Sequence, residues 1–528
     1  MKMNLLLIVS IAYMVLSSCG DSDESVLPDN KPDIIDETLD YREPFATTAA
    51  YQTFYKPVNA DVGDPMPYYD ETDQMFYIYF LIGNFSGYSR GGIYLTKTKD
   101  FAKFQNTAST QILVGNDGDR DEGIGTGCCI KKDNAFHFFY TGFNDGMYKQ
   151  MVTKATTNDL TKTWYKVKSL AVNAPTRYEK NEFRDPCVYW DDTRNKYVML
   201  VGSSSSGKAA IARFQSDDLT QWESIEGIKA VAENPQKFEM ETDTKITECP
   251  DIFKMGNKWY LVFSRINRDE HRKTFYRMAD NPDGPWKICG DRAQNNHHET
   301  FDGLWLYAAK TVSDGTTRYL SGWASAGQER QASNGELSWG GMLVTHKLVQ
   351  QTDGKLYPVI PDAVDAKFSK EVTYKDIKTD GNVSGNSDSF TVSNGKVVFN
   401  RNASSVKIQL KIDAVQATKD FGIAFGAHNN QADAYHITFD LTSDNRYGQP
   451  SLFLYHKGKE LNFTPLIVAG NKQYEVTIII ERQVCTMYVN DNVAFTNHIS
   501  NMEQNPWMIF SNEGIAKFNN IKIYRLPN

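Results

Sequence analysis

The sequence predicts an all-β chain, a five-bladed β-propeller followed by a C-terminal β-sandwich. An apolar, strand-like segment recurs about every 60 residues over the first two thirds of the chain. The last third alternates apolar and polar residues with period two, and amphipathic helical periodicity is largely missing from the repeat region. With 528 residues, of which 41% are hydrophobic and 12% aromatic, the chain is long enough for two cores.

The N-terminus carries a predicted export signal. Residues 1–19 combine Lys2 with a short apolar run and end in LSSC at Cys19, which resembles a bacterial lipobox. The run is shorter than the roughly 20 residues that a membrane-spanning helix needs. Residues 20–45 are acidic and lack a pattern, which is typical of a solvated tether. We therefore expect lipidation of Cys19 and anchoring to the bacterial outer membrane, at the cell surface.

Five apolar segments indicate the blades. They begin at Phe76, Phe136, Tyr197, Trp259 and Arg318, at intervals of 60, 61, 62 and 59 residues. Each follows a polar turn, ETDQ, KKDN, DDTRN, MGN or SDGTT. A four-stranded antiparallel sheet with its loops takes about 45 to 60 residues, so each period fits one propeller blade. The alternative is a sandwich whose strands happen to be evenly spaced.

The pattern of apolar and polar residues changes after Pro361. Segments such as SVKIQLKI, AYHITFDL, YEVTIIIE and CTMYVND alternate in period two and are joined by the turns SNGK, HKGK and AGNK. Short strands with regular Gly/Asn/Asp turns are typical of two packed antiparallel sheets. We assign residues 46–365 to the propeller and residues 366–528 to the sandwich.

Charge and cysteine content exclude several kinds of partner. The formal net charge is −8 and no basic stripe is present, so a nucleic-acid partner is not expected. The six cysteines after Cys19 contain no C-x-x-C pair, which gives zinc or redox chemistry no support. We expect them to be mostly free, buried thiols, and we expect no metal site and no cofactor.

Three acidic residues occupy similar places in the repeat. Asp64 and Asp185 each lie 12 residues before the apolar segment of their blade, and Glu248 lies 11 residues before its segment. Each lies at the start of one of the similar phrases GDPMPYYD, RDPCVYWD and ECPDIF. Innermost propeller strands converge on the central channel, so three carboxylates are expected to meet there. Such crowding is costly, but acid–base chemistry uses it to keep one carboxyl protonated and another ionised. The alternative is that each acid caps a turn beside its proline.

These phrases resemble those of glycoside hydrolase family 32, enzymes that cleave fructans and sucrose. GDPMPYYD stands where that family has its nucleophile motif, FRDPCVYW resembles its R-D-P motif, and TECPDIF resembles its E-C acid/base motif. Supporting matches are GTGCCIKKDNAFHFFYTG, FDGLWLYAAKTV, YLSGWAS, WGGMLVTHKL followed by DGKLYPV, and VCTMYVNDNVAFT. The resemblance covers nearly the whole mature chain and implies the same propeller and sandwich.

The resemblance also implies roles for individual residues. Asp64 would attack the anomeric carbon of a furanosyl unit. Glu248 would protonate the leaving oxygen and then deprotonate water, while Asp185 and Arg184 hold ring hydroxyls. This mechanism retains configuration, for which the two reacting carboxyl groups are expected roughly 5–5.5 Å apart. The implied substrates are fructans of levan or inulin type, fructo-oligosaccharides or sucrose.

Three further residues are candidates for sugar contact. Tyr307 and Trp323 could stack on a sugar, because aromatic faces suit apolar sugar faces. Asp302 could accept a hydrogen bond from a sugar hydroxyl. The expected partners are therefore an oligo- or polysaccharide, the membrane through Cys19, and possible neighbouring glycan-uptake proteins.

The first motif departs from the family. The family usually has W-x-N-D-P-N-G, whereas Gly63 precedes Asp64 here and Met66-Pro67 follow Pro65. The usual P-R-E is also missing from WGGMLVTHKL. Two alternatives stay open on this evidence: an inverting five-bladed glycosidase for arabinan- or xylan-type substrates, and a catalytically inert glycan-binding surface lipoprotein.

Overall fold

The computed structural model describes most of the chain after the predicted tether. Described are residues 53–527, apart from 58–59, 84–91, 106–111, 145, 147, 163, 229–243, 268–271, 291–297, 326–338, 374–376, 401–404, 427–433 and 500–505. The predicted lipobox at Cys19 and the acidic tether lie outside the described residues. Within the described ranges, no helix is both long and apolar enough to cross a membrane.

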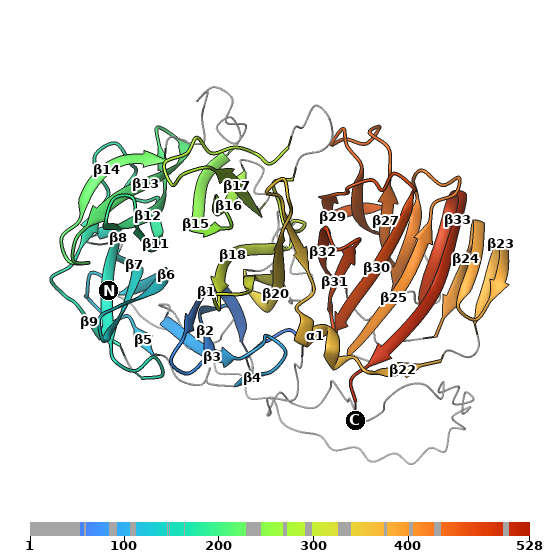
Figure 1. The fold of residues 1–528 in the computed structure, drawn as a ribbon, viewed down its shortest axis with the longest axis horizontal. Coiled ribbons are helices and arrows are strands. Elements are labelled where there is room, and N and C mark those ends of the chain that lie inside the picture. Colours follow the sequence, from blue (N-terminus) through green and yellow to red (C-terminus); the bar gives the residue numbers. More distant parts are fainter. Residues whose placement is uncertain are drawn as a thin grey trace, which may run out of the picture. The chain divides into compact units, whose positions relative to one another are not determined.

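The first part of the described chain is a five-bladed β-propeller, which confirms the predicted all-β class (Figure 1). Each blade is an antiparallel meander. The first blade contains β1 (Asp61–Asp70), β2 (Met75–Gly83), β3 (Gly92–Thr98), β4 (Phe104–Gln105) and β5 (Leu113–Val114). The second contains β6 (Gly123–Lys132), β7 (Ala135–Asn144), β8 (Tyr148–Thr157), β9 (Tyr165–Lys166) and β10 (Val172–Asn173).

The remaining blades repeat this order. The third contains β11 (Phe183–Asp191), β12 (Lys196–Ser205), β13 (Lys208–Ser216) and β14 (Glu223–Ile228). The fourth contains β15 (Thr244–Met255), β16 (Lys258–Asn267) and β17 (Arg272–Ala279). The fifth contains β18 (Leu306–Ser313), β19 (Arg318–Ser325), β20 (Gly341–Gln350) and β21 (Leu356–Val359). Val62 of β1 pairs with Gly341 of β20, so the first and last blades share one sheet and close the ring.

The five repeated apolar segments form the second strand of each blade: β2, β7, β12, β16 and β19. Their central side chains are almost fully buried, as at Tyr79, Phe139, Leu200 and Leu261. Neighbouring blades cover both faces of these strands, which explains why their sequences are nearly continuous apolar runs rather than alternating ones. The innermost strands β1, β6, β11, β15 and β18 surround a common centre (Figure 1).

A β-sandwich follows the propeller. The short helix α1 (Asp362–Lys367) links the two, and the predicted boundary at residue 365 lies inside it. The sandwich contains β22 (Lys370–Val372), β23 (Lys378–Asn386), β24 (Ser389–Phe399), β25 (Ser405–Asp413), β26 (Phe421–Phe425), β27 (Tyr435–Asp440), β28 (Ser451–His456), β29 (Lys459–Pro465), β30 (Gln473–Glu481), β31 (Val484–Val489), β32 (Val493–His498) and β33 (Trp507–Arg525).

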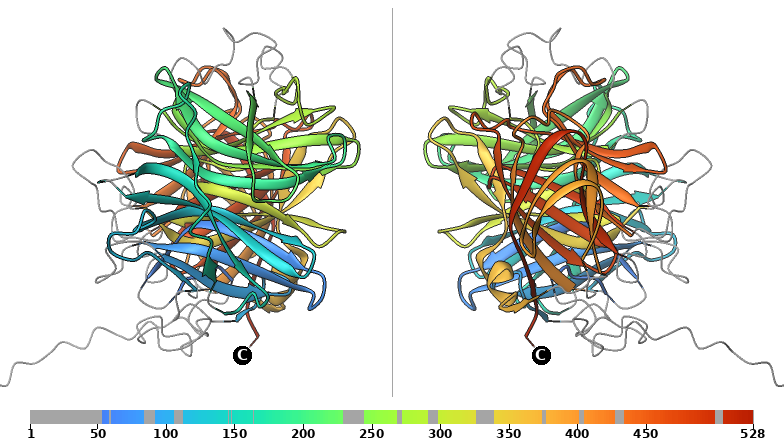
Figure 2. Two further views of the ribbon diagram at one scale, coloured as in Figure 1. Left: turned by 90° about the vertical axis from the view of Figure 1, so that its left-hand side faces the viewer. Right: turned by 90° about the vertical axis from the view of Figure 1, so that its right-hand side faces the viewer.

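The last strand organises the sandwich. The first half of β33 pairs with β24 and β26, and its second half pairs with β22 and β25. It is the long red strand among the orange ones in Figure 2. Apolar side chains from both halves, including Trp507 and Phe518, join one buried core. A second cluster joins Leu348 of the propeller to Tyr488 of the sandwich, so the two parts share apolar contacts.

The six described cysteines are all free, and four of them are buried. This confirms the prediction of mostly free, buried thiols. Several of them lie close to the innermost strands, where the candidate site is found.

Candidate active site

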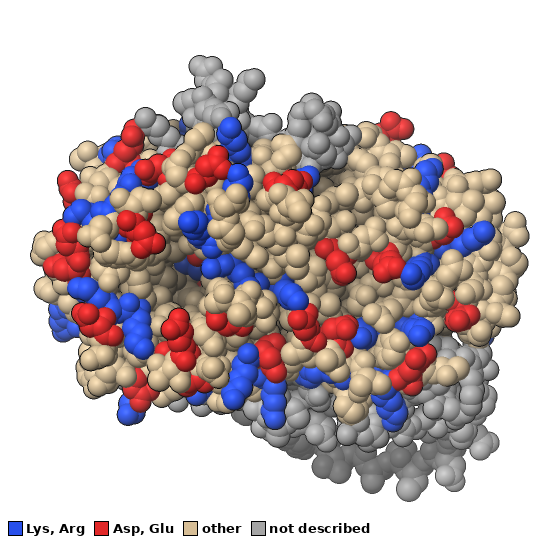
Figure 3. Space-filling view, viewed as in Figure 1, with Lys and Arg blue, Asp and Glu red and all other residues tan. Residues whose placement is uncertain are grey.

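Each innermost strand carries a β-bulge at the same place. The strand register shifts between Gly63 and Met66, Ile124 and Gly127, Arg184 and Cys187, Glu248 and Asp251, and Tyr307 and Lys310. A bulge bends its strand and re-aims the side chains beside it. The repeat therefore delivers five equivalent, redirected positions to the centre of the propeller, where Figure 3 shows the molecular surface hollowed.

The bulges revise the expected register of the three acids. Asp64, Asp185, Cys249 and Ala308 have left-handed backbone conformations at the bulge, with φ between 37° and 61°. The equivalent position in the fourth blade is thus Cys249, and Glu248 lies one residue earlier. The prediction that all three acids share one position is wrong by one residue for Glu248, because the bulge, rather than the distance to the next strand, sets the register.

Asp64 is held by two neighbouring blades. Its Oδ1 accepts a hydrogen bond from Trp323 Nε1 at 3.0 Å, and its Oδ2 accepts one from Thr126 Oγ1 at 2.8 Å. Burial, followed by the charges of Asp185 and Glu248, raises the pKa of Asp64 to about 7. The carboxyl group is therefore oriented by two donors and titrates close to neutral pH.

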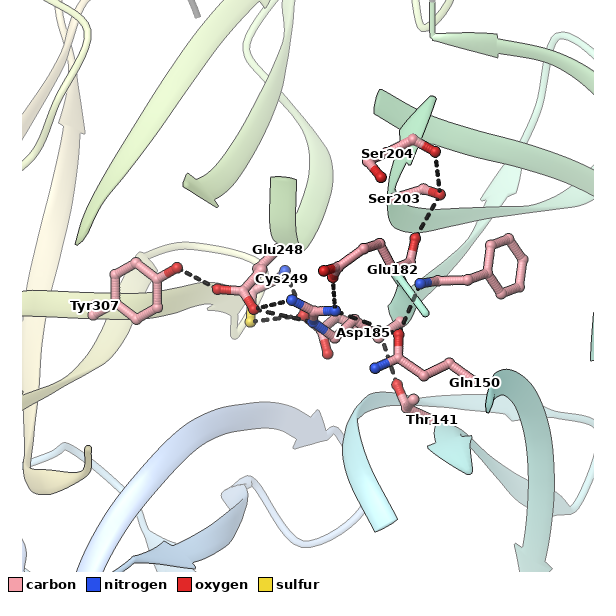
Figure 4. A network of polar contacts seen from close by, with 11 residues as sticks. Thr141, Gln150, Glu182, Asp185, Ser203, Ser204, Glu248, Cys249 and Tyr307 are labelled. Atoms are coloured by element: carbon pink, nitrogen blue, oxygen red, sulfur yellow. Dashed lines mark hydrogen bonds and ion pairs between the residues drawn. The ribbon is translucent and has the colours of Figure 1, made fainter. Parts of the chain in front are cut away.

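Glu248 lies between a tyrosine and an arginine. Its Oε1 accepts two hydrogen bonds from Arg184, from Nε at 3.0 Å and from Nη2 at 2.8 Å. Tyr307 donates its hydroxyl hydrogen to Oε2. Arg184 also contacts Glu182 and Gln150 through Nη1. Figure 4 shows this network running from Tyr307 through Glu248 to Glu182 and Gln150, so both oxygens of Glu248 have fixed partners.

Asp185 is bonded to the blades on either side of its own. Its backbone N–H donates to Thr141 Oγ1 at 2.8 Å, and its Oδ2 accepts a hydrogen bond from Cys249 N at 3.0 Å. Burial and the charge of Glu248 raise the pKa of Asp185, while Arg184 and a buried lysine oppose the rise. Asp64, Asp185 and Glu248, which come from three blades, thus influence one another electrostatically in one cluster, in which Asp185 is buried and the other two are partly buried.

That lysine, Lys310, was not among the predicted site residues. Only 3% of it is exposed, and its Nζ donates to the backbone oxygens of Gly127 at 2.9 Å and Pro186 at 3.4 Å. Burial acts to lower the pKa of Lys310, but nearby cysteine thiols and Asp185 raise it above its ordinary value. The sequence did carry a signal for this residue, because a lysine inside the apolar strand LYAAKTV is unusual.

Three aromatic side chains line up beside the carboxylates. Tyr307 and Trp323, both predicted, have ring centroids 5.7 Å apart with planes at 73°. Trp323 and Trp339 follow at 6.1 Å and 59°. The row, which we call the aromatic wall, connects the partner of Glu248 to the partner of Asp64. Trp339 was not predicted, because a single tryptophan before a strand resembles a core residue.

Asp302 does not join this cluster. Its Oδ1 accepts a hydrogen bond from Thr496 N at 2.6 Å, and its Oδ2 accepts one from Thr496 Oγ1 at 2.5 Å. His346 Nε2 lies 3.0 Å from Oδ2. Thr496 belongs to β32 of the sandwich, so the structure gives Asp302 a packing role between propeller and sandwich. This differs from the expected sugar contact, because both carboxylate oxygens of Asp302 are taken up by Thr496 and His346.

Two residues of the altered first motif also have defined places. Met66 is buried, and its sulfur accepts a hydrogen bond from Gly127 N at 3.0 Å. It packs between the first two blades and belongs to their shared core. Gly63 lies against the ring of Trp339.

Comparison with known proteins places the chain in a family. Residues 58–358 match the glycosyl hydrolases family 32 N-terminal domain, and residues 354–523 match the GH32, BT1760-like, C-terminal domain. A sucrose-6-phosphate hydrolase from Escherichia coli is 21% identical over 431 residues, which cover 79% of this chain and 82% of that protein. A levanbiose-producing levanase from Geobacillus stearothermophilus is 25% identical over 159 residues, covering 27% of this chain and 35% of the levanase.

Solved structures agree on the fold. The fructan 1-exohydrolase IIa from Cichorium intybus superposes with a TM-score of 0.69 at 14% sequence identity, over 90% of this chain and 97% of that one. The family match covers more than half of the chain and includes all three carboxylates. The chain therefore belongs to glycoside hydrolase family 32 and is a fructosidase-type glycoside hydrolase.

Proposed function

We propose that this protein is a retaining glycoside hydrolase that cleaves fructofuranosyl linkages in levan- or inulin-type fructans, in fructo-oligosaccharides or in sucrose. The observation that carries the proposal is the cluster of Asp64, Asp185 and Glu248 at the centre of the propeller, in which each carboxyl group has different hydrogen-bond partners. Different partners are what separate a nucleophile from a proton donor when both are carboxyl groups.

The proposed first step forms a covalent intermediate. An ionised Asp64 oxygen attacks the anomeric carbon, and the bond to the leaving oxygen breaks while Glu248 supplies its proton. Trp323 and Thr126, which donate to the two oxygens of Asp64, orient the nucleophile. In the second step water attacks the same carbon, Glu248 takes a proton from that water, and Asp64 leaves as a carboxylate.

In the proposed reaction, the substrate competes with Glu248 for Arg184. Arg184 donates two hydrogen bonds to Glu248 in the substrate-free site. A sugar hydroxyl that competes for the guanidinium would weaken this pair. We propose that Arg184 and Asp185 then hold ring hydroxyls. Interactions of this kind contribute to the rate when they strengthen in the transition state.

The sequence supports an extracellular polysaccharide as substrate. The LSSC sequence at Cys19 and the acidic segment after it fit a lipoprotein displayed at the cell surface, where intact fructans are encountered. We therefore include lipid anchoring in the proposal, together with delivery of the products to neighbouring uptake proteins.

One incubation series tests the proposed function. Wild-type protein and Asp64→Asn are incubated separately with levan, inulin, sucrose and arabinan, and the release of reducing sugar is measured. Release from levan or inulin by the wild type, with no release by Asp64→Asn, is the expected result. Release from arabinan alone would support the inverting alternative, and absence of release from every sugar would contradict the proposal.

A further inference from the structure

Arg184 contacts a second carboxylate, Glu182, to which the proposed reaction gives no role. Nη1 of Arg184 lies 2.5 Å from Oε2 of Glu182, while Nε and Nη2 donate to Oε1 of Glu248 (Figure 4). The two carboxylates therefore bind different nitrogen atoms of one guanidinium group. The side chains of Glu182, Arg184 and Glu248 are 27%, 20% and 15% exposed, so solvent screens these contacts only in part.

The residues around Glu182 fix its place. The backbone oxygen of Glu182 accepts hydrogen bonds from Ser203 Oγ at 2.7 Å and from Ser204 N at 3.3 Å, both on β12. Phe183, the next residue, is fully buried in an apolar core, and its N–H donates to Gln150 Oε1 at 2.8 Å. The backbone on both sides of the Glu182 side chain is thus anchored to neighbouring strands, which holds the carboxylate beside the arginine.

The proposed reaction changes the charge of Glu248 but not that of Arg184. Glu248 must carry a proton to act as the acid, whereas a guanidinium group in a protein stays charged. An arginine with a single carboxylate partner favours the ionised form of that partner. A second carboxylate on the same guanidinium divides this attraction, and its own negative charge opposes ionisation of the first. Both effects of Glu182 favour the protonated form of Glu248.

Other groups also face Glu248, and Arg184 connects it to Glu182. The titratable and charged groups around Glu248 are Asp64 of β1, Arg184 and Asp185 of β11, Cys249 of its own strand β15, Tyr307 of β18, and Arg272 of β17, whose guanidinium lies 5.9 Å from the centre of the Tyr307 ring. Of these groups, Arg184 is the one bonded to Glu182. A substitution at Glu182 therefore acts on Glu248 chiefly through the arginine.

We infer that Glu182 is a positioning residue for the proton donor: it shares the guanidinium of Arg184 with Glu248, and so keeps Glu248 able to hold its proton where Asp64 is ionised. The inference rests on the proposed function. It also gives Arg184 a charged partner at the stage of the reaction at which Glu248 is neutral, so that the guanidinium stays in place for the ring hydroxyls.

The pH dependence of kcat/KM tests the inference. Glu182→Gln keeps the shape of the side chain and removes its charge, and it is compared with wild type on the fructan that the wild type cleaves best. The basic limb of the profile, where the proton donor loses its proton, should move about one pH unit lower in the variant, the scale of one nearby charge. At pH values above that limb, kcat/KM should be about 10-fold below wild type, and the difference should shrink toward acidic pH.

A second substrate separates proton donation from a distorted site. Fluoride leaves without a proton donor, so Glu182→Gln and wild type should have similar kcat/KM on a fructosyl fluoride at every pH. Glu182→Asp, which keeps the charge on a shorter side chain, should recover part of the shift seen with the fructan. All variants are checked by thermal melting.

Glu179→Gln is the matched control for loss of one charge. Glu179 belongs to the same turn, since its backbone oxygen accepts a hydrogen bond from Glu182 N, but its side chain is bonded to Gly207 N. Its profile should match wild type. An unshifted basic limb in Glu182→Gln, an equal shift in Glu179→Gln, or an equal loss on fructan and fluoride would overturn the inference, while wild-type activity leaves the proposed function standing. A wild type that cleaves no fructan would instead overturn the proposed function.

Discussion

The two aspartates of the cluster have a strained backbone conformation, which fixes the direction of their side chains. Asp64 and Asp185 have φ values of 37° and 61°, a conformation that costs a residue other than glycine about 1 kcal/mol. Asp is among the residues that tolerate it best. At Asp185 the strain is offset by bonds to Thr141 and Cys249 on the two adjacent blades. Fixed direction is what a nucleophile and a hydroxyl-binding group require, since small misplacements cost much of the rate.

Ionising Asp64 should cost stability, and the cost should depend on pH. In the unfolded chain this carboxyl ionises near pH 3.8, whereas the folded protein keeps its proton until about pH 7. The free energy of unfolding therefore falls as pH rises through this window, by up to about 4 kcal/mol in all. Asp64→Asn has no such loss. Its melting temperature should exceed that of the wild type at pH 8, and the difference should shrink as pH falls toward 4.5.

Differential scanning calorimetry across this pH range measures the effect. Asp192→Asn, at an exposed aspartate in the turn after β11, serves as the control for removal of one negative charge. If the melting temperatures of wild type and Asp64→Asn changed in parallel with pH, the prediction that ionising Asp64 destabilises the fold would be contradicted.

At the scale of the elements, the bulges turn a repeated strand into a site. Five equivalent bulges face the centre, and the chain fills them differently in each blade. The first and third hold aspartates, and the fourth holds Cys249 with Glu248 just before it. Lys310, directly after the bulge of the fifth blade, donates to backbone oxygens beside the bulges of the second and third. Its charge also opposes the rise in the pKa of Asp185.

Replacing Lys310 should loosen three blades at once. Lys310→Met keeps an unbranched side chain, one atom shorter, but leaves two buried carbonyl groups without this donor. We expect a loss of about 3 kcal/mol in the free energy of unfolding, the scale for breaking a buried charged contact. Chemical denaturation measures it. Lys411→Met is the matched control, because that lysine side chain is 54% exposed and should change stability little. Equal stabilities of the two variants would contradict a structural role for Lys310.

The elements also show how far the sequence could predict the site. The blades were predictable because buried second strands form long apolar runs that repeat at one period. Asp64 and Asp185 were predictable because each opens the same Asp-Pro phrase. The position of Glu248 one residue before the bulge was not predictable, since a bulge adds a residue without a sequence signal of its own. Trp339 and Thr126 were missed because they reach Asp64 or its neighbour from other blades, and such contacts depend on tertiary structure.

At the scale of the whole molecule, the sandwich supports the propeller through buried polar as well as apolar contacts. Asp302 accepts two hydrogen bonds from Thr496 of the sandwich, and His346 connects Asp302 to Tyr488. Glu481 accepts hydrogen bonds from the backbone of Thr53 and Phe54, which precede the first blade. The catalytic groups proposed above all belong to the propeller, so the expected role of the sandwich is stability.

Removing Asp302 should therefore weaken the fold and leave the chemistry intact. Asp302→Ala leaves the N–H and hydroxyl groups of Thr496 buried without their acceptor, which should cost about 3 kcal/mol. The expected result is a lower melting temperature with kcat/KM on the preferred fructan unchanged at a temperature where the variant is folded. A fall in kcat/KM without a change in melting temperature would restore Asp302 as a sugar-contacting residue.

The proposed lipid anchoring rests on one residue near the N-terminus, Cys19. If Cys19 is lipidated, the protein expressed in its bacterial host should fractionate with membranes, and Cys19→Ala should release it in soluble form. Ser18→Ala keeps the cysteine and serves as the control. Immunoblots of membrane and soluble fractions give the distribution. A wild type found entirely in the soluble fraction would contradict lipid anchoring.

The central claim is that Asp64 is the nucleophile of a retaining reaction, and a trapped intermediate tests it most directly. Glu248→Gln is mixed with a fructosyl fluoride, whose leaving group needs little help from an acid, so the first step proceeds while the missing base slows the second. Peptide mass spectrometry should find one fructosyl unit attached to the peptide that contains Asp64. Release of fluoride without any attached sugar, or attachment at another residue, would contradict the account.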